Sequence, residues 1–510
     1  MRRSIALQSF MAALGLYLSV LLFLTAPTYS TWQAGKRPNI LFIIADDWSY
    51  PHAGSYGDKV VKTPNFDRVA RQGALFTNSF CVSPSCTPSR AAVLTGQAVH
   101  RLEEGANLHG FLPKKFAVYP DLLEAAGYHV GYTRKGWAPG VLGGTGRVQN
   151  SQVTATQVID SAKLEENGRT RNPAGPAYKS FEEFFKGKPA AKPFCFWFGS
   201  SDPHRPYVKG SGLQSGMRLE DVQVSAFLPD TPEVRSDILD YYFEVQRLDR
   251  EIGELLRLLE AAGQLDDTMV VITSDNGMPF PRAKANVHDG GSRMPLAIRW
   301  PAAVKGGQII DDFVSHADFA PTFLEAAGLK PLEAMTGRSL IGLLKGGKQK
   351  DRDRVFLERE RHANVRRGDL SYPVRAVRTS EFLYVRNLRP DRWPAGDPEM
   401  YKAVGPFGDV DASTTKELIL NRRADKEIAG YFRSAFEKRP AEELFNLRTD
   451  PAQLVNVAGE PRHAEAKKRL RAALDEWMKE TADPRATSND DRFDRYPYFG
   501  NAAGMSTNQP

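Results

Sequence analysis

The stretch RPNILFIIADDWS, residues 37–49, joins an unbroken apolar run to two acids. Ile40 to Ala45 carry no polar side chain, so a strand formed by them would be buried on both faces. Such strands are typical of the centre of a parallel sheet that is covered by helices on both sides. Asp46 and Asp47 would then stand at the carboxyl end of a central strand.

The same pattern returns twice further along the chain. In DDTMVVITSDNGMPF, residues 266–280, an apolar run ends just before Asp275 and Asn276. Another buried run, Phe194 to Phe198, leads into a loop that carries His204. Because sites in open α/β sheets form beyond the carboxyl ends of the strands, we expect these polar residues to lie close together.

Helical patterns separate these strands, as in residues 236–262, where apolar residues recur at helical spacing. The alternation predicts an α/β domain with a large, mostly parallel sheet over residues 37–350. Residues 351–482, with a predicted hairpin at 372–388, predict a smaller C-terminal α+β domain that contains an antiparallel sheet. Residues 483–510 have the composition of a loosely ordered tail.

The first residues of the chain predict an export signal. Arg2 and Arg3 precede an apolar run from Phe10 to Leu24, and small and polar residues follow it. The run is about 15 residues long, short of the roughly 20 that a membrane-spanning helix needs. We therefore expect residues 1–34 to be a cleaved signal peptide, and the mature protein to be secreted or periplasmic without a membrane span.

The charge and the cysteine content limit what the protein is expected to bind and how it is cross-linked. A net charge of +7 suits an anionic substrate, but no nucleic-acid-binding motif accompanies it, so we expect no nucleic acid partner. The chain has three cysteines, Cys81, Cys86 and Cys195, which are too few for a disulfide scaffold. Whether Cys81 pairs with Cys195 stays open at this point.

The two acidic strand ends predict a cation site. Asp46, Asp47, Asp275 and Asn276 would form an all-oxygen set with up to three negative charges. Because uncompensated carboxylates repel one another, a hard cation such as Ca²⁺ or Mg²⁺ is the natural resolution. Asp46–Asp47 or Asp275–Asn276 alone could be ordinary cap or turn residues. Because both pairs directly follow a buried strand, a metal site is the favoured interpretation.

Cys86 stands at the predicted start of a helix, with Pro88 in its first turn and Arg90 one turn further on. One interpretation is a buried structural cysteine, and another is a nucleophilic thiolate favoured by the positive field. A thiolate is a poor match for a hard, oxygen-loving cation. The mismatch indicates that Cys86 does not work as a thiol.

The pentapeptide CTPSR, residues 86–90, resembles the Cys-x-Pro-x-Arg motif of the type I, formylglycine-dependent sulfatases of the alkaline phosphatase superfamily. The resemblance extends over almost the whole mature chain and includes the segments PNILFIIADD, DPHRPY, TSDNG, KANVHDGGSRMPLAIRWP and ELFNLRTDPAQLVNVA. It implies an alkaline-phosphatase-like sandwich and an enzyme that hydrolyses sulfate groups. It also implies that a formylglycine-generating enzyme oxidises Cys86 to formylglycine.

The same resemblance implies the roles of the site residues. One divalent cation, Ca²⁺ with Mg²⁺ as the alternative, would be held by Asp46, Asp47, Asp275, Asn276 and the modified Cys86. The charge on the sulfate oxygens and the nucleophile would be steadied by Arg90, Lys135 and Lys284. His204 would donate a proton to the departing sugar oxygen or nitrogen.

The chain departs from the family pattern at two places. Where the family has Gly-Lys-Trp-His, this chain has Lys135 followed by Gly-Trp-Ala, so the histidine partner is missing. His100 or His109 could cover part of its work, or be ordinary surface histidines. In KANVHDGG, His288 and Asp289 replace the usual aromatic residue and glutamate, and His288 could bind substrate or simply support the loop.

Within the family, the chain resembles the heparan N-sulfatase (sulfamidase) branch, through SDNGMPFP, FLPDTPEVRSDI, SYPVRAV and EWMKETADP. That branch also contains bacterial members that act on O-sulfated polysaccharides. Arg361, His362, Arg366 and Arg367 precede SYPVRAV and could meet a carboxylate or a second sulfate. The alternative for them is a solvated basic loop.

The function that we expect is a sulfatase for sulfated saccharides, with sulfamate or sulfate ester, the sugar and a homodimeric state left open. One alternative is a phosphatase, phosphodiesterase or phosphonate hydrolase of the same superfamily. Another is a non-catalytic binder of sulfated glycans in which Cys86 stays a cysteine.

Overall fold

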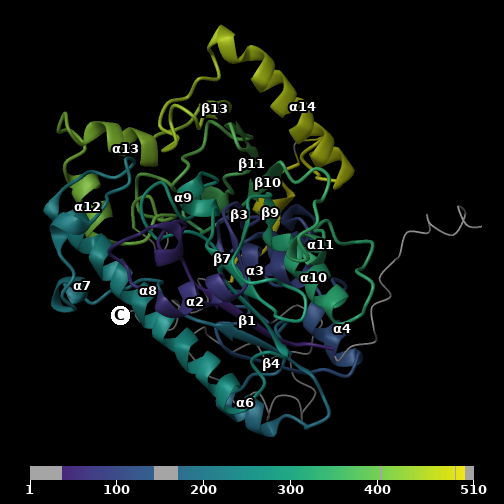
Figure 1. Cartoon of the computed structure of the whole chain (residues 1–510). Coiled ribbons are helices and arrows are strands. Elements are labelled where there is room, and N and C mark those ends of the chain that lie inside the picture. Colours follow the sequence, from purple (N-terminus) through teal and green to yellow (C-terminus); the bar gives the residue numbers. More distant parts are fainter. Residues whose placement is uncertain (1–36, 143–170, 402–404, 489, 500–510) are drawn as a thin grey trace, which may run out of the picture. The chain divides into compact units, whose positions relative to one another are not determined.

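The computed structural model describes residues 37–142, 171–401, 405–488 and 490–499 (Figure 1). The chain divides into Met1–Arg37 and a compact unit, Pro38–Pro510, and every element below belongs to this second unit. The predicted signal peptide, residues 1–34, lies outside the described residues. Within the described ranges, no helix is both long enough and apolar enough to cross a bilayer.

The larger sheet has seven strands: β1 (Asn39–Ala45), β2 (Ala74–Phe76), β4 (His129–Arg134), β5 (Phe194–Gly199), β6 (Thr268–Ser274), β7 (Leu296–Arg299) and β8 (Gln308–Ile310). Their order is β4-β5-β1-β6-β7-β2-β8. The first four strands in that order are mutually parallel, and β7 runs antiparallel to both of its neighbours. The predicted large, mostly parallel sheet with β1 inside it is confirmed.

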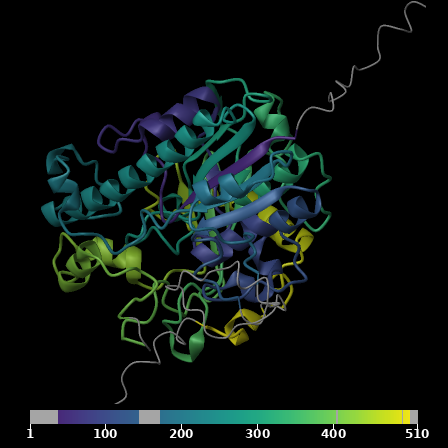
Figure 2. The same ribbon diagram turned by 90° about the horizontal axis from the view of Figure 1, so that it is seen from below.

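Helices cover the sheet on both faces, and the ones that form its two cores are α2 (Pro64–Gln72), α3 (Cys86–Thr95), α4 (Tyr119–Ala125), α8 (Pro232–Ala261) and α10 (Phe319–Ala326). Side chains of β1 alternate between the cores, so that Phe42 packs with α3, α4 and α10 while Ile43 packs with α2 and α8. Figure 1 shows α8 and α2 on one side of β1 and α10 and α4 on the other. The long teal helix beside the sheet in Figure 2 is α8. The continuous burial of β1 explains why its sequence lacks polar alternation.

The smaller sheet is antiparallel, in the order β10 (Arg354–Arg359), β11 (Val374–Thr379), β12 (Phe382–Asn387) and β13 (Glu442–Asn446). The hairpin predicted over 372–388 is formed by β11 and β12. One face of this sheet is covered by α14, Ala464–Glu480. The C-terminal α+β architecture is thereby confirmed, while the exact domain boundaries stay predictions.

The shorter elements connect and cover these layers; they are β3 (Ser79–Phe80), β9 (Val314–Ser315), α6 (Phe181–Gly187), α7 (Ser211–Gln214), α9 (Asp289–Ser292), α11 (Ile341–Leu344), α12 (Thr414–Asn421), α13 (Ala429–Phe436) and α15 (Arg492–Arg495).

Buried ion pairs tie the described part of the C-terminal tail to the smaller sheet. Arg375 of β11 donates from Nε to Asp483 Oδ2 over 2.6 Å and from Nη2 to Glu360 Oε1 over 2.7 Å. Arg485 also binds Glu360, with Nη2 2.8 Å from Oε2. Because unpaired buried charges are costly, these pairs fix the path of the chain around residues 483–485.

His100 belongs to the same buried cluster, with Nδ1 2.8 Å from Glu358 Oε2. Burial alone would lower the pKa of His100, but Glu358 and Asp483 outweigh it and raise the pKa above its usual value. A raised folded pKa adds stability below the unfolded pKa of about 6.5, and this stability disappears as the pH rises through the folded pKa.

We therefore expect His100→Gln to lower the free energy of unfolding by about 3–5 kcal/mol at low pH, as for the loss of one partner of a buried pair. The difference in Tm from the wild type should shrink as the pH rises from about 5 to about 8. His463→Gln is the matched control, because its Nε2 lies 3.9 Å from a half-exposed Glu460. A difference for His100→Gln that stayed constant or grew with pH would contradict this account.

Candidate active site

A buried cluster of acids lies where β1, β6 and the start of α3 meet. Ligand atoms of Asp46, Asp47, Asp275 and Cys86 all lie within 4.8 Å of one another. Asn276 joins them, because its Nδ2 donates to Asp47 Oδ1 over 2.6 Å. The structure therefore brings together the whole set that the sequence predicts as cation ligands.

The backbone aims both strand ends at one centre. Parallel register pairs Ala45 with Ser274, and the N–H of Asp275 donates to the Ala45 carbonyl over 3.1 Å. Asp47 has a φ of 75°, in the left-handed region that non-glycine residues seldom adopt. Successive side chains of a regular strand point to opposite faces, so this departure from the strand lets Asp46 and Asp47 face the same centre.

Cys86 is the first residue of α3, and its Sγ lies 3.5 Å from Asp46 Oδ1. Burial, helped by the charges of Asp46 and Asp275, raises the pKa of the Cys86 thiol well above its usual value despite the nearby Lys135. A thiol in this position stays protonated and is a weak nucleophile. The geometry agrees with the prediction that Cys86 does not work as a thiol.

Each carboxylate of the cluster has one cationic partner: Arg90 for Asp275, Lys135 for Asp46 and Lys284 for Asp47. The Arg90 Nε–Asp275 Oδ2 distance is 2.9 Å, and the Lys284 Nζ–Asp47 Oδ2 distance is 2.8 Å. All three predicted cations therefore surround the cluster.

The site opens to solvent on the side of His204 and Lys135. The side chain of His204 is 35% exposed and that of Lys135 is 15% exposed, whereas Asp47 is fully buried. The Nδ1 of His204 bonds to the Arg205 carbonyl, which leaves Nε2 facing the site, 3.9 Å from Asp47 Oδ2. A substrate that enters from this side would meet His204 and Lys135 first.

Lys135 is held at the end of β4 by a close backbone approach. Its N–H donates to the Gly199 carbonyl over 2.9 Å, and its own carbonyl accepts from Trp197 Nε1 over 3.2 Å. A Cβ on Gly199 would lie 1.8 Å from the Lys135 carbonyl oxygen, so only glycine fits at this position.

The residues of the cluster fit a divalent cation. Among the described residues, the buried Oδ1 of Asn276 has no hydrogen-bond partner, and neither does Nη2 of Arg90. Burial raises the pKa of Asp47 to about 6 in spite of Lys284, which shows how costly its charge is without a further partner. Carboxylate and amide oxygens in this arrangement suit Ca²⁺ or Mg²⁺ rather than zinc.

Of the other predicted histidines, His362 lies beside the site. It is buried, with Nδ1 2.8 Å from the hydroxyl oxygen of Ser85, the residue before Cys86. Burial lowers the pKa of His362 to about 3. The ring of His109 packs against Tyr498, with centroids 5.1 Å apart, and burial and the charge of Lys135 lower its pKa to about 4. Both imidazoles are therefore neutral.

The structure does not bring His100 or His288 to the site. His100 is bound to Glu358, as described above. The ring of His288 packs against Phe445 with centroids 5.3 Å apart, and its Nε2 lies 3.3 Å from Arg282 Nη2. Asp289 pairs with Arg378, with Nη2 2.8 Å from Oδ2. These residues support the loop after β6.

The predicted basic loop is largely buried. Arg361 donates from Nη1 to the Asp369 carbonyl over 2.9 Å, and Arg366 binds Asp409. Arg367 is exposed and pairs with Glu399 at 3.1 Å. Arg361 and Arg366 are each only 1% exposed, so a solvated loop does not describe them. Most of their donors are bound within the fold, although Nε of Arg361 and Nη1 of Arg366 have no hydrogen-bond partner among the described residues.

The structure adds one acid that the sequence reasoning missed. Asp411 Oδ2 lies 3.2 Å from Lys284 Nζ, the ammonium that also contacts Asp47. Its only signal in the sequence is the acidic pair in GDVDAS, residues 408–413, just before α12.

The three cysteines are all free and buried, so Cys81 and Cys195 do not pair with each other.

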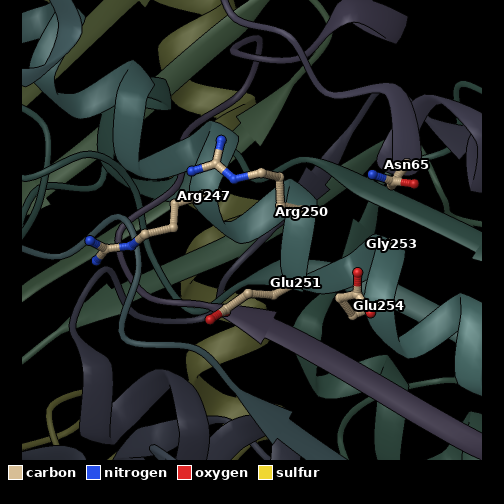
Figure 3. A pocket seen from close by; sticks show the side chains of 6 residues that line it. All are labelled: Asn65, Arg247, Arg250, Glu251, Gly253 and Glu254. Atoms are coloured by element: carbon tan, nitrogen blue, oxygen red, sulfur yellow. The ribbon is translucent and has the colours of Figure 1, made fainter. Parts of the chain in front are cut away.

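A separate surface pocket lies along α8, away from the acidic cluster, and is lined by Asn65, Arg247, Arg250, Glu251, Gly253 and Glu254 (Figure 3). From its edge, Arg247 donates from Nε to Asp202 Oδ2 over 2.6 Å. Arg247 thereby anchors the loop that carries His204.

Comparison with known proteins gives matches over most of the chain. Residues 38–329 match the family model described as sulfatase, and residues 283–397 match the one described as N-sulphoglucosamine sulphohydrolase, C-terminal. Human N-sulphoglucosamine sulphohydrolase is 31% identical over 494 residues, which cover 88% of this chain and 91% of the human protein. An ulvan-active sulfatase of Formosa agariphila is 27% identical over 479 residues, covering 87% of this chain and 75% of its own.

Solved structures share the fold. A protein in complex with its substrate D-glucosamine-2-N,6-O-disulfate superposes with a TM-score of 0.61 at 20% identity, covering 89% of this chain and all of the other. The phosphonate monoester hydrolase of Agrobacterium radiobacter gives 0.63 at 18% identity, covering 87% and 96%. At this identity the likeness shows an alkaline-phosphatase-like fold alone.

The family assignment rests on the sequence matches. The sulfatase model covers more than half of the chain, and the human relative is matched over nearly its whole length. The chain therefore belongs to the sulfatase family, as an enzyme that hydrolyses sulfate esters or sulfamates.

Proposed function

We propose that the protein is an exported, formylglycine-dependent sulfatase that releases inorganic sulfate from sulfated saccharides. The observation that carries the proposal is the position of Cys86 at the start of α3, within 4.8 Å of three carboxylates. Burial raises the pKa of its thiol, which disfavours a thiolate, and the oxygen donors around it suit a hard cation. Residues 1–34 would direct export, and a formylglycine-generating enzyme would convert Cys86.

The residues present fit a Ca²⁺ ion, with Mg²⁺ as the alternative, held by Asp46, Asp47, Asp275, Asn276 and the modified residue 86. Together, the cation and the aldehyde hydrate at position 86 would supply a nucleophilic oxygen near neutral pH.

The cationic side chains would stabilise the charge that develops during transfer. Arg90, Lys135 and Lys284 each lie against one carboxylate of the cluster. A cation bound to those carboxylates would weaken these pairings and leave the ammonium and guanidinium groups free to bind sulfate oxygens. Because the groups are fixed in a largely buried site, they need little reorganisation and act strongly.

His204 would protonate the leaving group. Its Nδ1 bonds to a backbone carbonyl, so a proton on Nε2 makes the ring an imidazolium, the form that can act as an acid. Its partial exposure supports this role, because a departing sugar oxygen or nitrogen could reach the ring from solvent.

We expect His204→Ala to reduce turnover of a sulfated sugar by about 10²–10⁴-fold, the usual contribution of a general acid. An activated aryl sulfate should lose much less, because its leaving group departs without a proton. The measurement is kcat/KM for both substrates, with His463→Ala as the control, because His463 lies at the start of α14 and packs against Phe382. Equal losses on the two substrates would remove His204 from this role.

The first substrate candidate is the sulfamate of N-sulfated glucosamine. It is supported by the human relative and by the match of residues 283–397 to the C-terminal model named after the same enzyme. The second candidate is a sulfate ester of a polysaccharide, which is supported by the similarity to the ulvan-active sulfatases.

The test is sulfate release from N-sulfoglucosamine, beside N-acetylglucosamine 6-sulfate and ulvan oligosaccharides. It uses protein whose Cys86 peptide carries the aldehyde by mass. Release from the sulfamate alone supports the first candidate, and release from an ester alone supports the second. Hydrolysis of phosphate or phosphonate monoesters without any sulfate release would overturn the proposed function.

A further inference from the structure

Asp411 extends the site beyond the reacting centre. It lies in the segment 405–413, which leads into α12, far from β1 and β6 in sequence. Its Oδ2 is 3.2 Å from Lys284 Nζ, and the same ammonium is 2.8 Å from Asp47 Oδ2. One lysine therefore links Asp411 to the cation ligand Asp47.

The other carboxylate oxygen of Asp411 is available to a ligand. The side chain is 29% exposed, although Lys284 beside it is only 4% exposed. Oδ2 is the buried oxygen, so the exposure falls on the Oδ1 side of the group. Within the described residues, Oδ1 accepts no hydrogen bond.

Asp411 is a partly exposed carboxylate beside Lys284, the lysine that also contacts the cation ligand Asp47. Burial alone would raise the pKa of Asp411, but the charges of Lys284, His204 and His362 outweigh burial and hold the pKa at about 2. The group is therefore a negative charge that solvent can reach, one lysine away from the acidic cluster.

The neighbouring acid has a different task. Asp409, two residues earlier, is buried and shared by Arg359 and Arg366, and its Oδ1 accepts from the Ala363 N–H over 2.9 Å. These contacts fix the segment from which Asp411 projects. Asp409 thus positions the loop, while the side chain of Asp411 stays partly exposed beside Lys284.

We propose that Asp411 determines specificity by binding the sugar, an inference that rests on the proposed function. Its Oδ1 accepts a hydrogen bond from a hydroxyl or amine next to the sulfated position. A second sulfate or a carboxylate at that place would be repelled by the same charge. The substrate class is a saccharide with a free donor beside the scissile sulfate group and no second anion there.

The test compares a sulfated sugar with an aryl sulfate that has no such donor. The sugar is whichever of N-sulfoglucosamine, N-acetylglucosamine 6-sulfate and N-acetylgalactosamine 6-sulfate the wild type hydrolyses fastest, and the aryl sulfate is p-nitrophenyl sulfate. The readout is the kcat/KM for the sugar divided by the kcat/KM for the aryl sulfate. For Asp411→Ala the ratio should fall at least about tenfold, because a site built to hydrogen-bond a group discriminates strongly for it.

Asp411→Asn keeps the shape and one acceptor oxygen but removes the charge, so its ratio should lie between those of the wild type and Asp411→Ala. Glu399→Gln is the matched control, since Glu399 is an exposed acid paired only with Arg367 at the surface, and its ratio should not change. An unchanged ratio in both Asp411 variants would overturn the inference, whether turnover stays the same or falls equally on both substrates. A wild type that releases no sulfate from any of these compounds or from ulvan oligosaccharides would instead refute the proposed function.

Discussion

Replacing Cys86 by alanine is expected to reduce sulfate release by ~10⁴-fold or more, the scale on which enzymes lose turnover without their nucleophile. The reason is chemical, because alanine cannot be oxidised to the aldehyde. The side chain is buried and small, so the variant should fold and keep its carboxylates in place. The measurement is kcat on the best sugar substrate and on p-nitrophenyl sulfate, with folding checked by Tm.

The matched control for this prediction is Cys195→Ala, which removes another buried free thiol from β5. Cys195 faces the core beneath the sheet, so its loss should lower Tm and leave turnover per folded molecule nearly unchanged. Substantial turnover by Cys86→Ala would show that another residue attacks sulfur.

Asp275→Ala is expected to lower turnover by at least ~10²-fold, because even losses of residues that only support a metal ligand cost about 10–100-fold. Asp275 has two roles: it is a proposed cation ligand, and it is the buried partner of Arg90. Removing it would weaken cation binding and leave the guanidinium unpaired, which also destabilises the fold by about 3–5 kcal/mol. Asp275→Asn keeps the shape, and so separates the loss of charge from the loss of packing.

The measurement pairs turnover with calorimetric Ca²⁺ binding, both taken per folded molecule. Asp266→Ala is the control, because it removes an acid near the other end of β6 whose side chain is 83% exposed. Near-normal turnover in Asp275→Ala would remove the residue from the ligand set. Loss of turnover with unchanged Ca²⁺ affinity would also remove Asp275 from the ligand set. Its role would then be to pair with Arg90.

Much of the fold and of the reacting centre could be predicted because both follow from local pattern and strand direction. The apolar run of β1 needs burial on both faces, which implies a parallel sheet between helices. Parallel strands end at one edge, so Asp46 and Asp275 had to be neighbours although 229 residues separate Asp47 from Asn276. The mismatch between a thiolate and a hard cation indicates that Cys86 does not work as a thiol, whereas its conversion to formylglycine is implied by the family resemblance.

The surroundings of the centre could not be predicted in the same way. Asp411 reaches Lys284 only through the path of a loop from the smaller domain, and no period or spacing encodes that path. Arg361 is a different case, because its charged side chain suggests a surface or a ligand. In the fold it is buried against backbone carbonyls, which the sequence does not reveal.

The histidine that the family has after Gly-Lys-Trp is an alanine in this chain, and the sequence pattern does not show which residue replaces it. Of the two histidines considered for its work, His100 is bound in an ion pair with Glu358, whereas the ring of His109 packs against Tyr498. His362, considered only for substrate binding, contacts Ser85 beside the nucleophile position. Which imidazole approaches a site depends on tertiary packing, and all three occur in loops or short helices.

The central claim, an aldehyde at residue 86 as the source of turnover, is tested most directly by measuring sulfate release against the fraction of Cys86 converted. Preparations made with and without a co-expressed formylglycine-generating enzyme would supply a range of fractions, each read by peptide mass. The account predicts turnover proportional to the aldehyde fraction, with none when residue 86 is entirely cysteine. Undiminished turnover by fully unconverted protein would contradict it.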